Sequence, residues 1–197
     1  MTLPLEPQVV PDAFRSAVEA LRAALDDAGR AGLSLHEVPA PRRLAPHAVA
    51  VAAEVVRDDD EIASGRFVVL HDPDGQEGWR GDTRVVAFVQ AEVDAEMAAD
   101  AALGEVGWSW LTESLEQRGA GYTAAGGTVT RTVSARFGQL SDPDEASEVE
   151  VRASWTPVRS EVDDDGLQLV RHLGAWCDLL CSTAGLPPPG VAALPRR

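Results

Sequence analysis

Residues 148–155 are Glu148-Val149-Glu150-Val151-Arg152-Ala153-Ser154-Trp155, and polar and apolar side chains alternate along them. Residues 128–137 have the same period of two, with one side formed by Val129, Val133, Ala135 and Phe137 and the other by Thr128, Thr130, Thr132 and Ser134. Successive side chains of a β-strand point to opposite faces of a sheet, so each stretch predicts a strand with one dry and one wet face. An antiparallel sheet that carries helices on one side has this pattern.

The N-terminal half predicts one helix followed by a meander. After Asp12, apolar residues recur at helical spacing, which predicts a helix that runs to about Gly29 or Gly32. Three prolines make residues 38–46 a stiff connector. Apolar runs then predict three antiparallel strands, separated by an acidic loop and a polar turn, at 47–56, 67–70 and 84–93.

The C-terminal half adds two helices around the two alternating strands. Helical spacing of apolar residues predicts a helix at about 102–117 and a last helix that carries Leu169, Leu173, Trp176 and Leu180. The element order is therefore α-βββ-α-ββ-α. The predicted fold class is α+β, a twisted antiparallel sheet of about five strands with helices packed on one face. We expect an extended arm at 1–11, a single domain at 12–186 and a Pro-rich tail at 187–197.

Composition restricts the partners. The chain has 197 residues, of which 45% are hydrophobic and 25% charged, as in a globular domain. Its net charge is −15, with 17 basic and 32 acidic residues. Nucleic acid and anionic lipid are bound through clustered Lys and Arg, so neither is an expected partner.

Residue usage and the N-terminal segment bear on origin and compartment. The chain has no Lys or Asn, as expected for a GC-rich genome. Its first residues have neither a basic start nor an apolar run, so we expect no signal peptide and a cytoplasmic location.

No stretch has the spacing of a known catalytic, metal or cofactor motif. Cys177 and Cys181 lie four residues apart on the last predicted helix, without the further ligands that a zinc site needs. The four histidines are scattered, and Gly126 and Gly127 form no phosphate loop and are expected at a joint between a helix and a strand. We therefore expect no metal and no cofactor.

A small set of residues could still form a pocket. Strand alternation puts Arg131 on the face that carries Val129 and Val133, and a buried guanidinium needs a carboxylate or an anionic ligand. A structural interpretation is open as well, because Arg131 could lie at a strand edge with its head in water. The pocket hypothesis places Arg131 with Trp155 and His172, between the sheet and the last helix.

Two tryptophans fall outside the predicted core stripes. Trp79 lies in a predicted turn, and Trp108 lies off the main apolar stripe of its helix. Exposed tryptophan is enriched at protein interfaces, so Trp79 and Trp108 are the candidate interaction residues.

Five segments resemble a family of uncharacterised actinobacterial proteins, number 3000 in the domain-of-unknown-function series. They are Glu37–Pro46, Gly65–Pro73, Glu105–Leu111, Arg152–Pro157 and Ala184–Pro188. The resemblance covers nearly the whole chain and implies a bacterial cytoplasmic origin, but it implies no reaction or site. The element order alone is also similar to that of the small acidic chaperones of type III secretion, which are dimers that bind other proteins.

These observations favour a non-enzymatic, acidic, cytoplasmic domain that binds another protein or a second copy of itself, as an adaptor or chaperone does. The alternative is an enzyme or small-molecule-binding domain with the pocket described above. A closed concave pocket with a perturbed ionisable group would favour the alternative.

Overall fold

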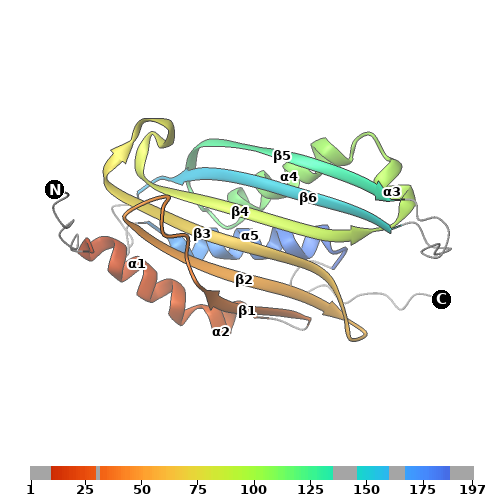
Figure 1. The fold of residues 1–197 in the computed structure, drawn as a ribbon, viewed down its shortest axis with the longest axis horizontal. Coiled ribbons are helices and arrows are strands. Elements are labelled where there is room, and N and C mark those ends of the chain that lie inside the picture. Colours follow the sequence, from red (N-terminus) through yellow and green to blue (C-terminus); the bar gives the residue numbers. More distant parts are fainter. Residues whose placement is uncertain (1–9, 30–31, 135–145, 160–166, 187–197) are drawn as a thin grey trace, which may run out of the picture.

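A computed structural model describes residues 10–29, 32–134, 146–159 and 167–186. Its centre is one antiparallel sheet in the order β1-β2-β3-β4-β6-β5 (Figure 1). The strands are β1 (Leu33–Val38), β2 (His47–Arg57), β3 (Asp60–Gln76), β4 (Gly81–Val93), β5 (Tyr122–Ser134) and β6 (Ala146–Pro157). β1 and β5 are the two edges of the sheet.

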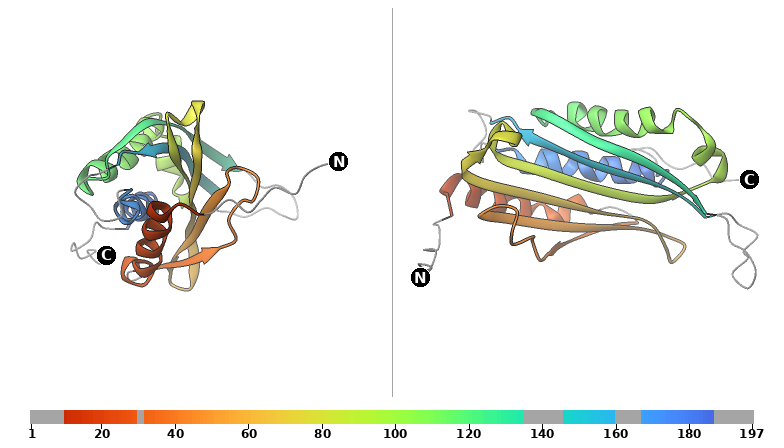
Figure 2. Two further views of the ribbon diagram at one scale, coloured as in Figure 1. Left: turned by 90° about the vertical axis from the view of Figure 1, so that its left-hand side faces the viewer. Right: turned by 45° about the horizontal axis from the view of Figure 1, so that its top comes forward.

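The helices cover one face of this sheet. They are α1 (Asp12–Ala23), α2 (Leu25–Ala28), α3 (Ala95–Ala99), α4 (Leu103–Gln117) and α5 (Leu169–Thr183), with a 3-10 turn η1 at Glu77–Trp79. The sheet bends around α5, and α1 and α4 lie on either side of that helix (Figure 2). Side chains that point to this face therefore form the core, whereas no α-helix of the described residues covers the opposite, outer face.

Strand register explains why one face is apolar. One row of paired residues runs across the whole sheet on the inner face and consists of Leu35, Ala53, Gly65, Val89, Val151 and Val129. The four central members of the row are buried. The largest buried side chains of the core, Trp155, Trp176 and Phe67, pack on the same side.

The predicted fold class is confirmed, with one strand more than expected. The extra strand is β1, which pairs with β2 directly after the first helices. Its only sequence signal is two leucines two residues apart, too weak to separate from a loop before a proline-rich connector. Arm residues 1–9 and tail residues 187–197, together with Ala135 and Phe137, lie outside the described residues.

Two predicted boundaries were wrong. β3 is much longer than the predicted run at 67–70, and it includes most of the predicted turn at 71–78. Pairing between β3 and β4 runs to His71 and Thr83, is interrupted over residues 72–75, and resumes with a shifted register at Gln76 and Gly81. Gly126 and Gly127 lie inside β5 and not at a joint before it.

The turn between β2 and β3 gives a first testable prediction. Asp58 and Asp59 have φ angles of 54° and 71°, the left-handed conformation of both central residues in a type I′ hairpin turn. Asn-Gly adopts this turn with less strain than Asp-Asp, so Asp58→Asn combined with Asp59→Gly should stabilise the fold by about 1 kcal/mol. Urea denaturation measures the change.

Asp74→Asn is the control, because it removes an exposed negative charge without a left-handed φ angle. If this control stabilised the fold equally, the gain would come from the loss of negative charge. The assignment of a strained type I′ turn at Asp58 and Asp59 would then be contradicted.

Candidate functional site

The outer face of the sheet carries an apolar row that only partly meets other protein atoms. The row runs through paired residues of all six strands, namely Val38, Ala50, Val68, Val86, Ser154 and Gly126. On the β2–β3 half, Ala50, Val68 and Leu70 are buried under the connector that joins β1 to β2 and under Trp79. Trp79, a predicted interaction residue, is half-buried in this cover.

On the β4–β6–β5 half, the same row is open. A shallow hollow of about 500 Å³ lies there, lined mainly by Val86, Phe88, Gly126, Gly127, Arg152 and Ser154. Val86 is 36% exposed, and Phe88 is partly exposed. Apolar side chains on this half therefore lie open to solvent, whereas their counterparts on the other half are covered.

Two neighbouring glycines of β5 leave space on opposite faces of the sheet, and Gly126 is the one that deepens the hollow. A Cβ placed on the backbone of Gly126 would have no heavy atom within 4 Å, so the outer side of this residue is open space. A Cβ at Gly127 would meet the Arg152 carbonyl oxygen and lie 2.8 Å from the Trp108 ring, which packs on the inner side. Trp108, the second predicted interaction residue, is thus half-buried and fills the space that Gly127 leaves.

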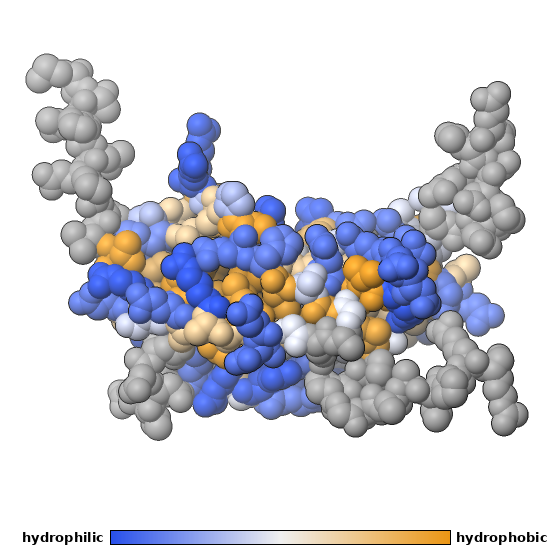
Figure 3. Space-filling view, turned by 90° about the horizontal axis from the view of Figure 1, so that it is seen from below, coloured by the Kyte–Doolittle hydropathy of each residue, from blue (hydrophilic) through white to orange (hydrophobic). Residues whose placement is uncertain are grey.

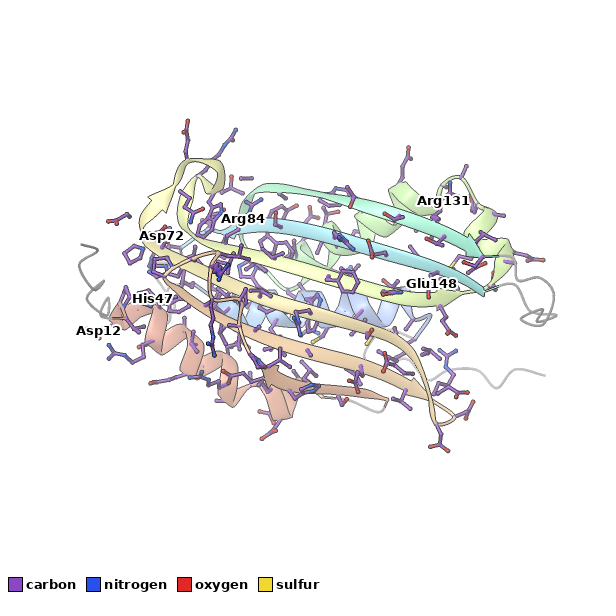
Figure 4. The ribbon with its side chains drawn as sticks, viewed as in Figure 1. Asp12, His47, Asp72, Arg84, Arg131 and Glu148 are labelled. Atoms are coloured by element: carbon purple, nitrogen blue, oxygen red, sulfur yellow. The ribbon has the colours of Figure 1, made fainter. Side chains whose placement is uncertain are left out.

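Two arginines border the hollow. The Arg152 guanidinium lies 5.5 Å from the centre of the Phe88 ring and is held by the Glu150 carboxylate at 2.7 and 3.0 Å. Arg84 donates to the Ala124 carbonyl oxygen at 2.9 Å and to Ser154 Oγ at 2.7 Å, and burial lowers the pKa of its guanidinium. Figure 4 shows Arg84 on this half of the sheet. Arg84 fixes the bulged start of β5 against β6. Arg152 packs its guanidinium over one face of the Phe88 ring.

The hollow lies beside the long free edge of the sheet. β5 has 13 residues and pairs only with β6, so no strand in the described part of the chain pairs with its far side. Almost all of its residues are exposed, including Val133 at 54%. Its single charged residue is Arg131, and the sequence contains no Asp or Glu from Arg118 to Ser141. We call this edge together with the hollow the β5 surface.

Arg131 serves this edge and not an internal pocket. Its Nη1 donates to the carbonyl oxygens of Ala98 and Asp100 at 3.1 and 2.6 Å, which ties the end of β5 to α3. Figure 4 shows Arg131 at that end of the sheet. The side chain is exposed, as in the structural interpretation of the sequence.

Trp155 and His172 do meet, deep in the core. Trp155 Nε1 donates to His172 Nδ1 at 3.1 Å, and both side chains are fully buried. Burial lowers the pKa of His172 to about 4. The structure thus brings together two of the three residues of the pocket hypothesis inside a packed sheet–helix interface and leaves Arg131 outside it.

A second polar cluster, formed by His71, Thr83 and Asp82, lies at the other end of the core. His71 Nδ1 lies 2.9 Å from Thr83 Oγ1, which donates to Asp82 Oδ1 at 2.9 Å. Since the Thr83 hydrogen goes to Asp82, the imidazole nitrogen must be the donor to Thr83, and Nε2 carries the lone pair. Phe14 stacks on His71 at a centroid distance of 4.8 Å, and burial lowers the pKa of His71. The Phe14 ring thus covers the imidazole, and the buried His71 and Thr83 side chains form part of the packed interior.

Other chemistries have no assembled site in the described part of the chain. Cys177 and Cys181 are buried on α5 in the apolar core. Among the described residues, no three His, Cys, Asp or Glu side chains are grouped so that they could hold a metal ion. No helix there has the length and apolar character required to cross a membrane.

The fold and this geometry define an α+β domain with a one-sided six-stranded sheet and an open β5 surface. The chain belongs to the family described as protein of unknown function (DUF3000), whose model matches residues 10–192. Neither the curated proteins nor the solved structures contain a match.

Sequence reasoning missed the residues that form the hollow. Val86 and Phe88 were assigned to the predicted strand at 84–93, but their side chains were not assigned to either face of the sheet. The two glycines were placed outside the strand. The available signal was the pair Gly126-Gly127 directly before a Thr- and Val-rich run that has no acidic residue. Such a run is unusual in a chain with a net charge of −15.

Proposed function

We propose that this protein is a non-enzymatic, cytoplasmic bacterial protein-binding domain, of the adaptor or chaperone-like kind, and that the β5 surface is its binding site. The observation that carries this proposal is the free 13-residue edge of β5, which lies beside an apolar hollow. The residue usage of the chain, typical of a GC-rich genome, is consistent with the bacterial origin that the family resemblance implies. The sequence has no disulfide framework, which supports the cytoplasmic part of the proposal.

A free strand edge presents unpaired backbone N–H and C=O groups, which another strand can pair with. Soluble proteins protect such edges by keeping them short, covering them or placing charges on them. β1, the opposite edge, has only six residues, and α2 contacts it. Its Glu37 is bound by Arg22 at 2.7 and 2.8 Å. Figure 3 shows that side of the molecule, where polar side chains lie between the exposed apolar ones. β5 contacts α3 and α4 on the inner side, but it is twice as long, and Arg131 is its only charged residue.

The hollow gives the added segment a place for an apolar side chain. Because Gly126 carries no side chain on the outer face, a bulky residue of a strand added to β5 can pass over it. There it would replace water on Val86 and on the Phe88 ring. Burial of apolar surface contributes about 25 cal/mol per Å², so the hollow adds affinity to the backbone pairing.

The alternative function, an enzyme or small-molecule-binding domain, has less support. Trp155 and His172 fill the sheet–helix interface, and Arg131 lies at the sheet edge. The excess of acidic residues also supports a protein partner over nucleic acid or an anionic membrane.

Site-specific photocrosslinking in cells tests the proposal. Thr130 and Ser34 are exposed residues at the two ends of one outer row, which passes through Glu150, Gln90, Ser64 and Glu54. We expect a photoreactive phenylalanine analogue in place of Thr130 to form discrete protein adducts, and the same analogue in place of Ser34 to form none.

The variant Phe88→Asp should reduce the yield of the Thr130 adducts at least tenfold, because it removes the apolar ring and a bound segment would have to desolvate the new carboxylate. Equal adducts at both positions, or none at Thr130, would refute the assignment of the binding surface.

A further inference from the structure

We infer that the occupant of the β5 edge is the β5 strand of a second copy of this chain, paired antiparallel about a two-fold axis. The two six-stranded sheets would then form one twelve-stranded sheet. This inference rests on the proposed function of the β5 surface and names its partner.

If two copies of this chain associate, the distribution of charge favours the β5 edge over their other surfaces. Each copy has a net charge of −15, so two copies repel each other wherever acidic residues face one another. Between Arg118 and Ser141 there is no acidic residue, and Arg131 is the only charged residue of β5. Two copies therefore meet at this edge with the least electrostatic cost. A basic partner would instead be drawn to the acidic outer face, where Glu54, Glu148 and Glu150 lie.

The sequence of β5 is also compatible with its own antiparallel copy. In a pairing centred on Thr128, Arg131 lies opposite Ala125 and Thr130 lies opposite Gly126. Any pairing that is not centred on Arg131 keeps the two arginines apart along the strands. The remaining residues are small or β-branched, which suits close cross-strand contacts.

The edge is large enough for a stable interface. Thirteen extended residues span about 43 Å at roughly 3.3 Å per residue. α4 lies along β5 and adds apolar surface through Val106, which is 39% exposed, and through the exposed part of Trp108. Such a strand pair with its helical flank has room for the ~1,600 Å² that a typical protein–protein interface buries.

The mass of the purified full chain in solution tests the inference. Light scattering after size exclusion should give about twice the monomer mass of 20.9 kDa. Thr130→Lys should raise the dimer dissociation constant at least tenfold, because lysine on an edge strand opposes strand pairing. Ser34→Lys is the matched control, since Thr130 pairs with Glu150 and Ser34 pairs with Glu54 on the opposite edge strand. It should leave the dimer intact.

The outcomes separate this inference from the proposed function. A wild-type monomer that forms Thr130 adducts with another protein would overturn the second-copy inference and leave the protein-binding function standing. A monomer without adducts would overturn both. A dimer that Thr130→Lys leaves unchanged would place the interface elsewhere. Thermal melting followed by circular dichroism shows whether each variant is folded. A photocrosslinked adduct at position 130 that contains only this chain would report the same pairing without the lysine substitution.

Discussion

Acidification from pH 7 to pH 4 should lower the free energy of unfolding by about 3 kcal/mol through His172 alone. Burial lowers the pKa of this histidine to about 4 in the folded protein, whereas an exposed histidine in the unfolded chain titrates near 6.5. The unfolded state therefore binds a proton first. Stability is fully present above pH 6.5 and is lost as the pH falls toward 4, at about 1.4 kcal/mol per pH unit.

The hydrogen bond from Trp155 explains why the fold disfavours the charged form. Trp155 Nε1–H donates to His172 Nδ1, so this nitrogen must be unprotonated. Protonation would set two donors against each other in a fully buried site. His71, whose pKa burial also lowers, should add to the loss in the same direction.

Urea denaturation followed by tryptophan fluorescence between pH 7.5 and 4 measures this loss. The variant His172→Asn should be less stable than the wild type at pH 7.5, because it loses packing, but its stability should fall less steeply below pH 6.5. His36→Asn is the control, since His36 is exposed on β1, and its profile should follow the wild type. A His172→Asn profile as steep as the wild type would show that this histidine does not titrate between pH 6.5 and 4.

Gly65→Ala should destabilise the fold by about 3 kcal/mol, the upper range for overpacking in a core. Gly65 lies in the buried row of the inner face, under Trp176. A Cβ there would lie 2.8 Å from both the Phe88 carbonyl oxygen and the Trp176 ring. Trp176 Nε1 donates to the same carbonyl at 3.2 Å, so a displaced indole would also lose this hydrogen bond.

Gly104→Ala is the matched control for this substitution. Gly104 lies in α4, where no neighbouring atom lies within 4 Å of the new Cβ, and alanine favours a helix over glycine by up to about 1 kcal/mol. Thermal or urea denaturation should therefore show opposite signs for the two variants. A Gly65→Ala protein as stable as the wild type would mean that Trp176 does not pack on this strand.

The alternating residues at 148–155 were sufficient to predict a sheet with one covered face, because the period of two directly records which side chains are buried. Val149, Val151, Ala153 and Trp155 are all buried on the inner face. The same reasoning failed for β3, whose polar residues after Leu70 extend the strand to Gln76 and pair with β4 only at His71 and Gln76. Backbone hydrogen bonds leave no periodic signal in the side chains.

The candidate site could not be predicted because it depends on which half of the outer face is covered. Val68 and Val86 are neighbours in one row, yet the connector and Trp79 bury the first and leave the second exposed. This difference arises because the connector between β1 and β2 crosses only the β2–β3 half of the outer face. No periodicity in the sequence predicts the path of such a loop. Trp79 and Trp108, the candidate interaction residues, each pack partly against the sheet.

Residue-resolved hydrogen exchange of the β5 amides is the most direct test of pairing at the β5 edge. In an edge strand, every second amide points away from the sheet and exchanges freely unless another strand pairs with it. Across Thr128–Ser134, we expect the amides that do not bond to β6 to exchange at least tenfold more slowly in the wild type than in Thr130→Lys. Free exchange of these amides in the wild type, at concentrations where the protein is fully associated, would show that the edge is unpaired and would contradict the account.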